Sequence, residues 1–267
     1  TRCAPSFLDD NARLLERAAS EVSRLPKVPR LQFALDEFWF ASRHLEEFAA
    51  LRAFIEAEIA VELQPFFKVL LASTIRAFSF QDVGQVKVKR DPRKVLRGTP
   101  PPSELLRARI PTAVARLHRF NELIADNQSE ARATTASADA YLARAPGEAD
   151  LIVTSPPYIN AMNYAMIQRY ELVLLGLVPF DALNSHQAEY FGTERVYARD
   201  YRTLHGFPQE HALAETMNPK LVRIFEQEPK RAYITYRFFE QMDQTAHRMV
   251  KAVRPGGRIV LVAGTNT

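Results

Sequence analysis

The chain has 267 residues, of which 47% are hydrophobic and 25% charged, as in ordinary globular proteins. No run approaches the roughly 20 apolar residues of a membrane-spanning helix, and the single cysteine, Cys3, excludes an internal disulfide and a cysteine-rich zinc site. Residues 1–7 lack the apolar core of a signal peptide, so we expect a protein of the reducing cytoplasm. The net charge of +4 is compatible with a nucleic-acid partner.

Residues 8–80 are predicted to be mainly helical. Apolar residues recur at helical spacing over residues 14–25 and again over residues 46–63. Pro65 then ends one helix or begins the next. We expect the aromatic run Phe38-Trp-Phe to pack mostly in the core, since three adjacent rings cannot all face one way. A base-stacking role for one of these rings stays open.

A basic loop is predicted over residues 85–102, where three prolines follow a cluster of cations opposed by one acid, Asp91. One interpretation is a solvated surface loop without a binding function. The functional interpretation is a strip that neutralises the phosphates of a nucleic acid. The cations that would contact phosphate are Lys87, Lys89, Arg90, Arg93, Lys94 and Arg97.

The rest of the chain mixes helical and strand patterns. We expect, in order, a helix over 104–127, a small-residue stretch over 131–140, a strand over 150–154, a helix over 160–178, an irregular polar region over 180–219, a helix over 232–253, a turn over 254–257 and a strand over 258–262. This order favours a mostly parallel sheet with covering helices. We divide the chain into a helical region, residues 1–130, and a catalytic part, residues 131–267.

The strand over 150–154 leads into the most informative motif. Its aliphatic residues 151–153 predict a short buried strand. Pro156 and Pro157 cannot donate to a sheet ladder, so the strand ends there in a stiff loop. Open α/β sheets bind their ligands at the carboxyl ends of their strands. The loop offers the Ser155 hydroxyl, backbone carbonyls and the Tyr158 ring.

The run Ser155-Pro-Pro-Tyr resembles the catalytic motif of the amino-directed DNA methyltransferases, which use S-adenosylmethionine as methyl donor. Further segments are similar, in the same order along the chain, to members of one bacterial group of these enzymes: residues 38–51, 158–164, 169–172, 191–196 and 253–262. Together with the Ser-Pro-Pro-Tyr motif, the resemblance spans roughly residues 36–267. It implies an α/β protein with a Rossmann-like class I methyltransferase sheet, incomplete here, and a large helical insertion.

The resemblance also implies roles for individual residues. Ser155 Oγ and the Pro156 carbonyl would accept hydrogen bonds from the amino group of the target base, and Pro157 belongs to the same catalytic loop. Tyr158 would stack on the base once it leaves the duplex.

The resemblance assigns Asp139 and Thr154 to cofactor binding. For Asp139, a turn or helix-capping role carries equal weight. The six histidines show no ligand spacing, so no metal site is predicted.

Two family features do not occur in this sequence: a glycine-rich cofactor loop, and a strand ending in an acid that binds the ribose of the cofactor. The family carries an Asp/Asn-Pro-Phe-x-Gly-x-Gly-Thr loop for the methionine part of the cofactor, whereas the only close glycine pair here is Gly256-Gly. In the group that this chain resembles, that loop would precede residue 1. We therefore expect a fragment, a truncated gene product or one half of a split enzyme, whose cofactor loop a second polypeptide supplies.

Three functional hypotheses follow from the resemblance. The first is methyl transfer to an amino group in double-stranded DNA, with cytosine favoured over adenine, in a bacterial or archaeal cytoplasm at the nucleoid. The second is a catalytically inactive nucleic-acid-binding module derived from the same fold. The third, weaker hypothesis is an RNA or protein methyltransferase. Binding of S-adenosylmethionine separates the first two, and competition between duplex DNA and RNA separates the third.

Overall fold

A computed structural model describes a mixed α/β protein that is mostly helical and has a two-stranded parallel sheet. Two compact units are formed, each described by itself: residues 1–130 with 165–183, and residues 131–164 with 184–267. The chain thus leaves the first unit and later returns to it. The described residues are 4–29, 36–82, 89–94, 99–126, 130–144, 146–157, 159, 164–201 and 214–264.

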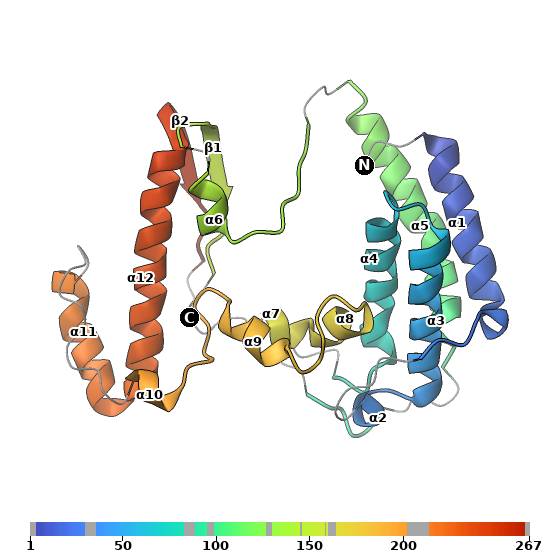
Figure 1. Ribbon diagram of the computed structural model, residues 1–267, viewed down its shortest axis with the longest axis horizontal. Coiled ribbons are helices and arrows are strands. Elements are labelled where there is room, and N and C mark those ends of the chain that lie inside the picture. The colour runs from blue at the N-terminus through green and yellow to red at the C-terminus, as the bar shows by residue number, and fades with distance from the viewer. Residues whose placement is uncertain are drawn as a thin grey trace. The chain divides into compact units, whose positions relative to one another are not determined.

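The first unit is helical (Figure 1). Pro5, Pro65 and Pro102 each stand in the first turn of a helix, where the missing N–H costs nothing, so Pro65 begins a helix. The elements are α1 (Pro5–Ser20), η1 (Val22–Arg24), α2 (Asp36–Trp39), α3 (Ser42–Glu58), α4 (Gln64–Ile75), η2 (Arg76–Phe78), α5 (Pro102–Leu123), most of α7 (Tyr164–Ile167) and α8 (Arg169–Leu174).

The hydrophobic core of the molecule lies in this first unit. Each long helix turns one apolar stripe inward, as the helical spacing predicts. Helix α8 adds residues to the same core, although it lies far along the chain from α1 to α5. Fully or nearly fully buried members are Leu8, Leu15, Phe48, Leu51, Ile55, Phe67, Leu71, Ile75, Leu106, Ile110, Tyr170, Val173 and Leu174.

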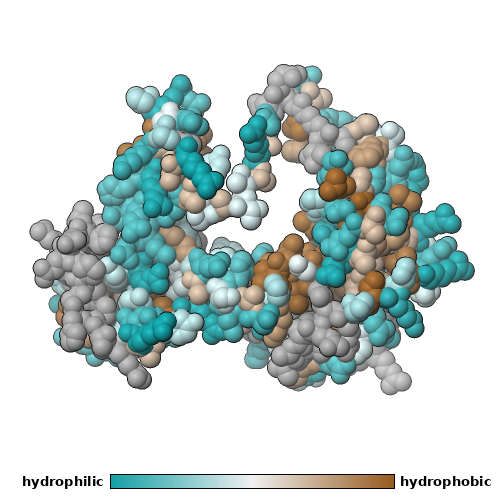
Figure 2. Space-filling model, viewed as in Figure 1, coloured by the Kyte–Doolittle hydropathy of each residue, from teal (hydrophilic) through white to brown (hydrophobic). Residues whose placement is uncertain are grey.

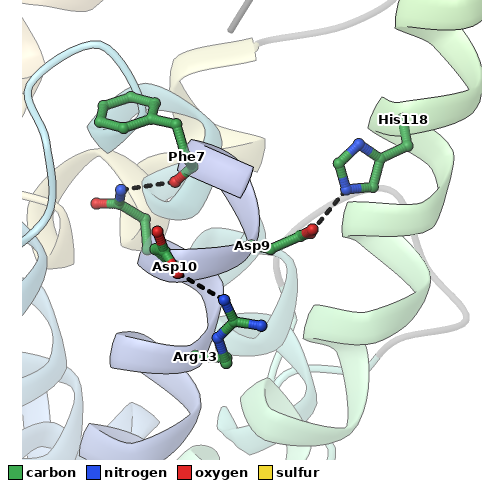
Figure 3. A network of polar contacts seen from close by, with 6 residues as sticks. Phe7, Asp9, Asp10, Arg13 and His118 are labelled. Atoms are coloured by element: carbon green, nitrogen blue, oxygen red, sulfur yellow. Dashed lines mark hydrogen bonds and ion pairs between the residues drawn. The ribbon is translucent and has the colours of Figure 1, made fainter. Parts of the chain in front are cut away.

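Polar contacts supplement the packing of α1 against α5 (Figure 3). His118 Nε2 lies 2.7 Å from Asp9 Oδ1, which joins the two helices directly. The Asn11 amide donates to the Phe7 carbonyl at 2.8 Å. Asp10 pairs with Arg13 at 2.5 Å on the exposed side of α1. The His118–Asp9 and Asp10–Arg13 contacts are both at least partly solvated, so they contribute less to stability than the apolar stripe beneath them.

The second unit is built around a long helix, α12 (Pro229–Ala252), which contacts α6, α10, α11 and the second strand. The visible side of α12 is mainly hydrophilic (Figure 2). The other elements are α6 (Ala138–Leu142), β1 (Ala149–Thr154), α9 (Leu183–Ala188), α10 (Ala198–Tyr201), α11 (Ala214–Gln227) and β2 (Val253–Leu261). Strands β1 and β2 are parallel, as expected of strands joined through helices.

The turn predicted over residues 254–257 is wrong, because these residues belong to strand β2 (Val253–Leu261), although none of them pairs with β1. The pairing shifts from Ala149↔Val253 to Leu151↔Arg258, so the extra residues of β2 form a bulge. Gly256 has φ +83°, which favours glycine. At Gly257 an added Cβ would lie 2.9 Å from the Asp150 carbonyl oxygen. The glycine pair is therefore needed for a bulge within the strand.

Two predicted segments also differ from the structure. The helix expected over 160–178 is two short helices, α7 and α8, with residues 160–163 outside the described part. The region expected to be irregular over 180–219 contains α9, α10 and the start of α11. A helix of four to six residues is too short for its periodicity to be recognised, and packing rather than propensity decides whether it forms.

The burial predicted for residues 151–153 is also wrong. Leu151 is 54% exposed and Val153 is 61% exposed, while Ile152 is half-buried. Successive side chains of a strand point to opposite faces. Leu151 and Val153 therefore share one face of β1, and their exposure shows that no described element covers that face. An aliphatic run predicts the strand correctly, but burial requires a second layer of structure.

Candidate functional site: the Ser-Pro-Pro loop and the basic turn

The Ser-Pro-Pro loop (residues 155–157) begins where β1 ends. Thr154 is paired with Leu261, and its carbonyl accepts a hydrogen bond from Val262 N–H at 2.9 Å. Because the two strands are parallel, their carboxyl ends meet at one edge of the sheet (Figure 1). Ser155 is exposed, whereas the two prolines are half-buried. Tyr158, the fourth residue of the predicted motif, lies outside the described residues.

Asp139, a predicted cofactor residue, lies in the first turn of α6. Ser137 caps this helix by accepting from Ala140 N–H at 3.1 Å, so the serine, not Asp139, is the cap. Asp139 Oδ1 accepts from Thr245 Oγ1 at 2.8 Å, and Oδ2 pairs with Arg248 at 3.1 Å. The acid therefore fastens α6 to α12. Its side chain remains 30% exposed, and each carboxylate oxygen can accept a further hydrogen bond.

Two more residues of interest lie at opposite ends of β1, and only Thr154 is next to the loop. The Thr154 side chain, also predicted to bind cofactor, is half-buried at the end of β1. Asp150 pairs with Arg254 Nε at 2.5 Å, next to the bulge in β2. Both partners of this pair are well exposed, so it contributes little to stability. The pairs Arg248–Asp139 and Arg254–Asp150 could not be predicted from local sequence, because each arginine lies about a hundred residues from its acid.

The cations of the predicted basic loop divide into two groups. Lys89 and Arg93 are exposed, with the Arg93 side chain 92% exposed. Arg90 and Lys94 instead turn toward the protein. Lys87 and Arg97 lie outside the described residues. We call residues 89–94 the basic turn.

Backbone pairing and the Lys94 side chain hold the basic turn. Gln81 and Arg90 form an antiparallel bridge, and Asp91 N–H donates to the Phe80 carbonyl at 2.9 Å. Lys94 Nζ donates to the Gln81 carbonyl at 3.2 Å. Burial lowers the pKa of Lys94, and the nearby Asp91 opposes that shift. Lys94 is therefore seated against the protein rather than directed into solvent.

A cluster of aromatic and cationic side chains from α2, Phe40 and α8 escaped the sequence analysis. The Arg169 guanidinium lies 4.7 Å from the Trp39 ring centre and 4.6 Å from that of Tyr170. Phe40 is buried against Tyr170, with ring centres 5.0 Å apart. Burial raises the pKa of the Tyr170 phenol well above its usual range. The only hint in the sequence was the run of three aromatics, which gives no indication of its partners.

None of the helices in the described part of the chain is long and apolar enough to cross a lipid bilayer. No protein-family model matches the sequence, and neither curated proteins nor solved structures provide a significant match.

Proposed function

We propose that this protein transfers a methyl group from S-adenosylmethionine to the exocyclic amino group of a base in double-stranded DNA, with cytosine favoured over adenine. The observation that carries the proposal is the position of the Ser-Pro-Pro loop. It follows β1 directly, at the edge where two parallel strands end, which is where open α/β sheets bind ligands.

The Ser155 hydroxyl supports this assignment. It is exposed, so a base extruded from the duplex has access to it. The half-buried prolines stiffen the backbone on which the hydroxyl and the Pro156 carbonyl are displayed. Acceptors fixed in this way need no reorganisation during the reaction.

The chemistry requires a better nucleophile than a free amino group, whose lone pair is delocalised into the base. Ser155 Oγ and the Pro156 carbonyl would accept the two N–H bonds and draw the nitrogen toward a pyramidal geometry. The cofactor, when bound, supplies an electrophilic methyl group. Nitrogen gains the N–C bond, sulfur keeps the electron pair of the broken C–S bond, and one amino proton leaves to solvent. Tyr158 would hold the base in line by stacking.

The described residues fit part of a cofactor site. The partly exposed Asp139 carboxylate can accept from the adenine amino group while keeping its bonds to Thr245 and Arg248. Thr154 lies at the sheet edge beside the Ser-Pro-Pro loop.

The test is methyl transfer from radiolabelled S-adenosylmethionine to duplex DNA by the full-length gene product. Removing one preorganised hydrogen-bond partner typically lowers kcat about 100-fold, so we expect at least that loss in Ser155→Ala. Tyr158→Ala should abolish transfer, because the base is no longer held by stacking. Ser23→Ala, an exposed serine of the first unit, is the matched control and should keep wild-type turnover. Unchanged kcat in Ser155→Ala and Tyr158→Ala would refute the assignment.

A nucleic-acid-binding module without catalysis is the second candidate. The observation that favours it is that both Asp139 oxygens already have protein partners. Calorimetric titration with S-adenosylmethionine distinguishes the two functions. Saturable heat together with a thermal shift supports the enzyme, whereas DNA binding with neither signal supports the binding module.

A further inference from the structure

We propose that Phe38 and the exposed cations of the basic turn, Lys89 and Arg93, together form a binding site for an unpaired nucleotide. The Phe38 ring stacks on the base, and the two cations neutralise the phosphates beside it. These are the two kinds of contact with which proteins hold single strands regardless of sequence. The site lies entirely within the first unit. The inference rests on the proposed function for the identity of its partner, DNA, and adds the strand form that this surface recognises.

Phe38 is the exposed member of the aromatic run over residues 38–40. It is 45% exposed, whereas Trp39 is half-buried and Phe40 is buried against Tyr170. The run therefore divides between surface and core, and Phe38 is the most accessible of its three rings. An exposed ring is stabilised when a base covers it, because both apolar surfaces leave water.

The contact between Phe38 and the basic turn gives this ring its significance, since a single exposed apolar side chain is common on protein surfaces. The Arg90 guanidinium lies 4.7 Å from the Phe38 ring centre, and Arg90 Nε donates to the Phe38 carbonyl at 3.0 Å. Arg90 is half-buried by these contacts, while Lys89 and Arg93 of the same turn are exposed. An accessible aromatic ring and two accessible cations are thus held on one short stretch of surface.

The local charge favours an anionic ligand. The basic turn has four cations and one acid, Asp91, whose Oδ1 accepts from Arg93 N–H at 2.9 Å and so closes the turn. Glu37, the acid beside the ring in sequence, accepts from Ser42 Oγ at 3.0 Å. In the described part of the chain, Lys89 forms no ion pair, and Arg93 forms only a 3.7 Å contact with Asp91. Both cations therefore keep charge that a phosphate can neutralise.

The experiment compares two single strands of equal length: oligothymidylate, and an abasic strand that has the phosphates without the bases. Fluorescence anisotropy gives each Kd for the full-length protein without cofactor. We expect the wild type to bind oligothymidylate at least about fivefold more tightly than the abasic strand, because stacking of one base supplies the difference. Phe38→Ala should reduce this preference by the same factor. Lys89→Ala with Arg93→Ala should weaken binding to both strands and flatten the salt dependence by about 0.7 in log–log slope for each lost phosphate contact.

Further variants distinguish stacking from a general effect on folding. Phe38→Trp should keep the preference for the strand with bases, because the aromatic surface is retained. Phe38→Leu should lose it, although leucine is also apolar. Phe120→Ala is the matched control and should behave as the wild type, since Phe120 is a 54% exposed ring on α5 with no cation over it among the described residues. Circular dichroism checks that each variant keeps its helical content.

Equal binding of the two strands by the wild type, or an undiminished preference in Phe38→Leu, overturns the nucleotide site. A loss in Phe120→Ala as large as that in Phe38→Ala overturns it as well. None of these measurements involves methyl transfer. If the wild-type protein transfers no methyl group, the proposed function fails, while a preference that depends on Phe38 still establishes the nucleotide site. If transfer occurs without that dependence, only the nucleotide site fails.

Discussion

The apolar residues on the helices of the first unit and those on strand β1 of the second unit differ in burial. In the first unit, Leu15, Leu51 and Phe67 are completely buried between helices. In the second unit, Leu151 and Val153 of β1 are more than half exposed, although residues 151–153 are all aliphatic. Helices bury one stripe against each other, whereas a parallel sheet has two faces and needs a covering layer on both. Aliphatic side chains are thus buried where the helices of the first unit pack together and exposed on the uncovered face of β1.

The comparison predicts a large difference in stability between matched truncations. Phe67→Ala should lower the free energy of unfolding by about 3–5 kcal/mol, because it empties a packed site. Val153→Ala should change it by no more than about 0.5 kcal/mol. Urea denaturation followed by far-ultraviolet circular dichroism measures both, and the fluorescence of the single tryptophan, Trp39, reports the first unit. A similar cost for the two variants would show that β1 has a buried face after all.

The second prediction concerns the place in the second unit where packing is tight. Gly257→Ala should destabilise the protein by about 1–3 kcal/mol through overpacking, since its Cβ would meet the Asp150 carbonyl and Val253. Val253→Ala should partly restore the stability by removing the Cγ1 atom 2.5 Å from that position. The same second substitution should not rescue Gly256→Ala, whose cost comes from φ +83° alone. Additive effects in the Gly257 pair would contradict the steric explanation.

The third prediction sharpens the division of the basic turn. Replacing Lys89 and Arg93 by Ala should flatten the salt dependence of DNA binding by about 0.9 in log–log slope for each phosphate that the protein no longer neutralises. Fluorescence anisotropy over a series of salt concentrations gives the slope. The control is Lys27→Ala with Arg24→Ala, two exposed cations elsewhere in the first unit. An equal slope for wild type and the Lys89/Arg93 variant would make the basic turn a plain solvated surface.

The prediction with the smallest expected effect asks whether the charged form of the Glu171 carboxylate destabilises the first unit. Burial raises the pKa of Glu171, and its Oε2 has no hydrogen-bond partner among the described residues. The folded state then holds this proton to higher pH than the unfolded state does. Stability contributed by the protonated form is present below the unfolded pKa, near 4.5, and is lost as pH rises through the raised folded pKa.

Glu171→Gln should therefore be more stable than the wild type at pH 7, with the difference shrinking toward pH 4. Thermal unfolding between pH 4 and pH 8 measures this, with Glu226→Gln on the exposed surface of α11 as control. A variant less stable than the wild type at pH 7 would mean that the charged carboxylate is stabilising, through the neighbouring Arg76.

Local pattern was enough for much of the fold. Helical spacing predicted helices that overlap α1, α3 and α5, and Pro65 marked a helix boundary, although the sequence did not decide whether a helix ends or begins there. The strand before Ser155 and the helix over 232–253 were also predicted close to their observed bounds. Patterns failed for the short helices α9 and α10 and for the bulge at Gly256, since these depend on neighbours outside the sequence window.

The sequence by itself determined the proposed catalytic motif, because prolines fix their own backbone and end a strand wherever they stand. Only the tertiary structure decided what the charged residues do. In the folded protein Asp139 pairs with α12, Arg90 packs on Phe38, Arg169 stacks on Trp39, and Leu151 is exposed to solvent. The physical reason is the distance along the chain over which each interaction acts. Backbone restriction acts within a few residues, whereas ion pairs, stacking and burial depend on segments that folding brings together from distant parts of the chain.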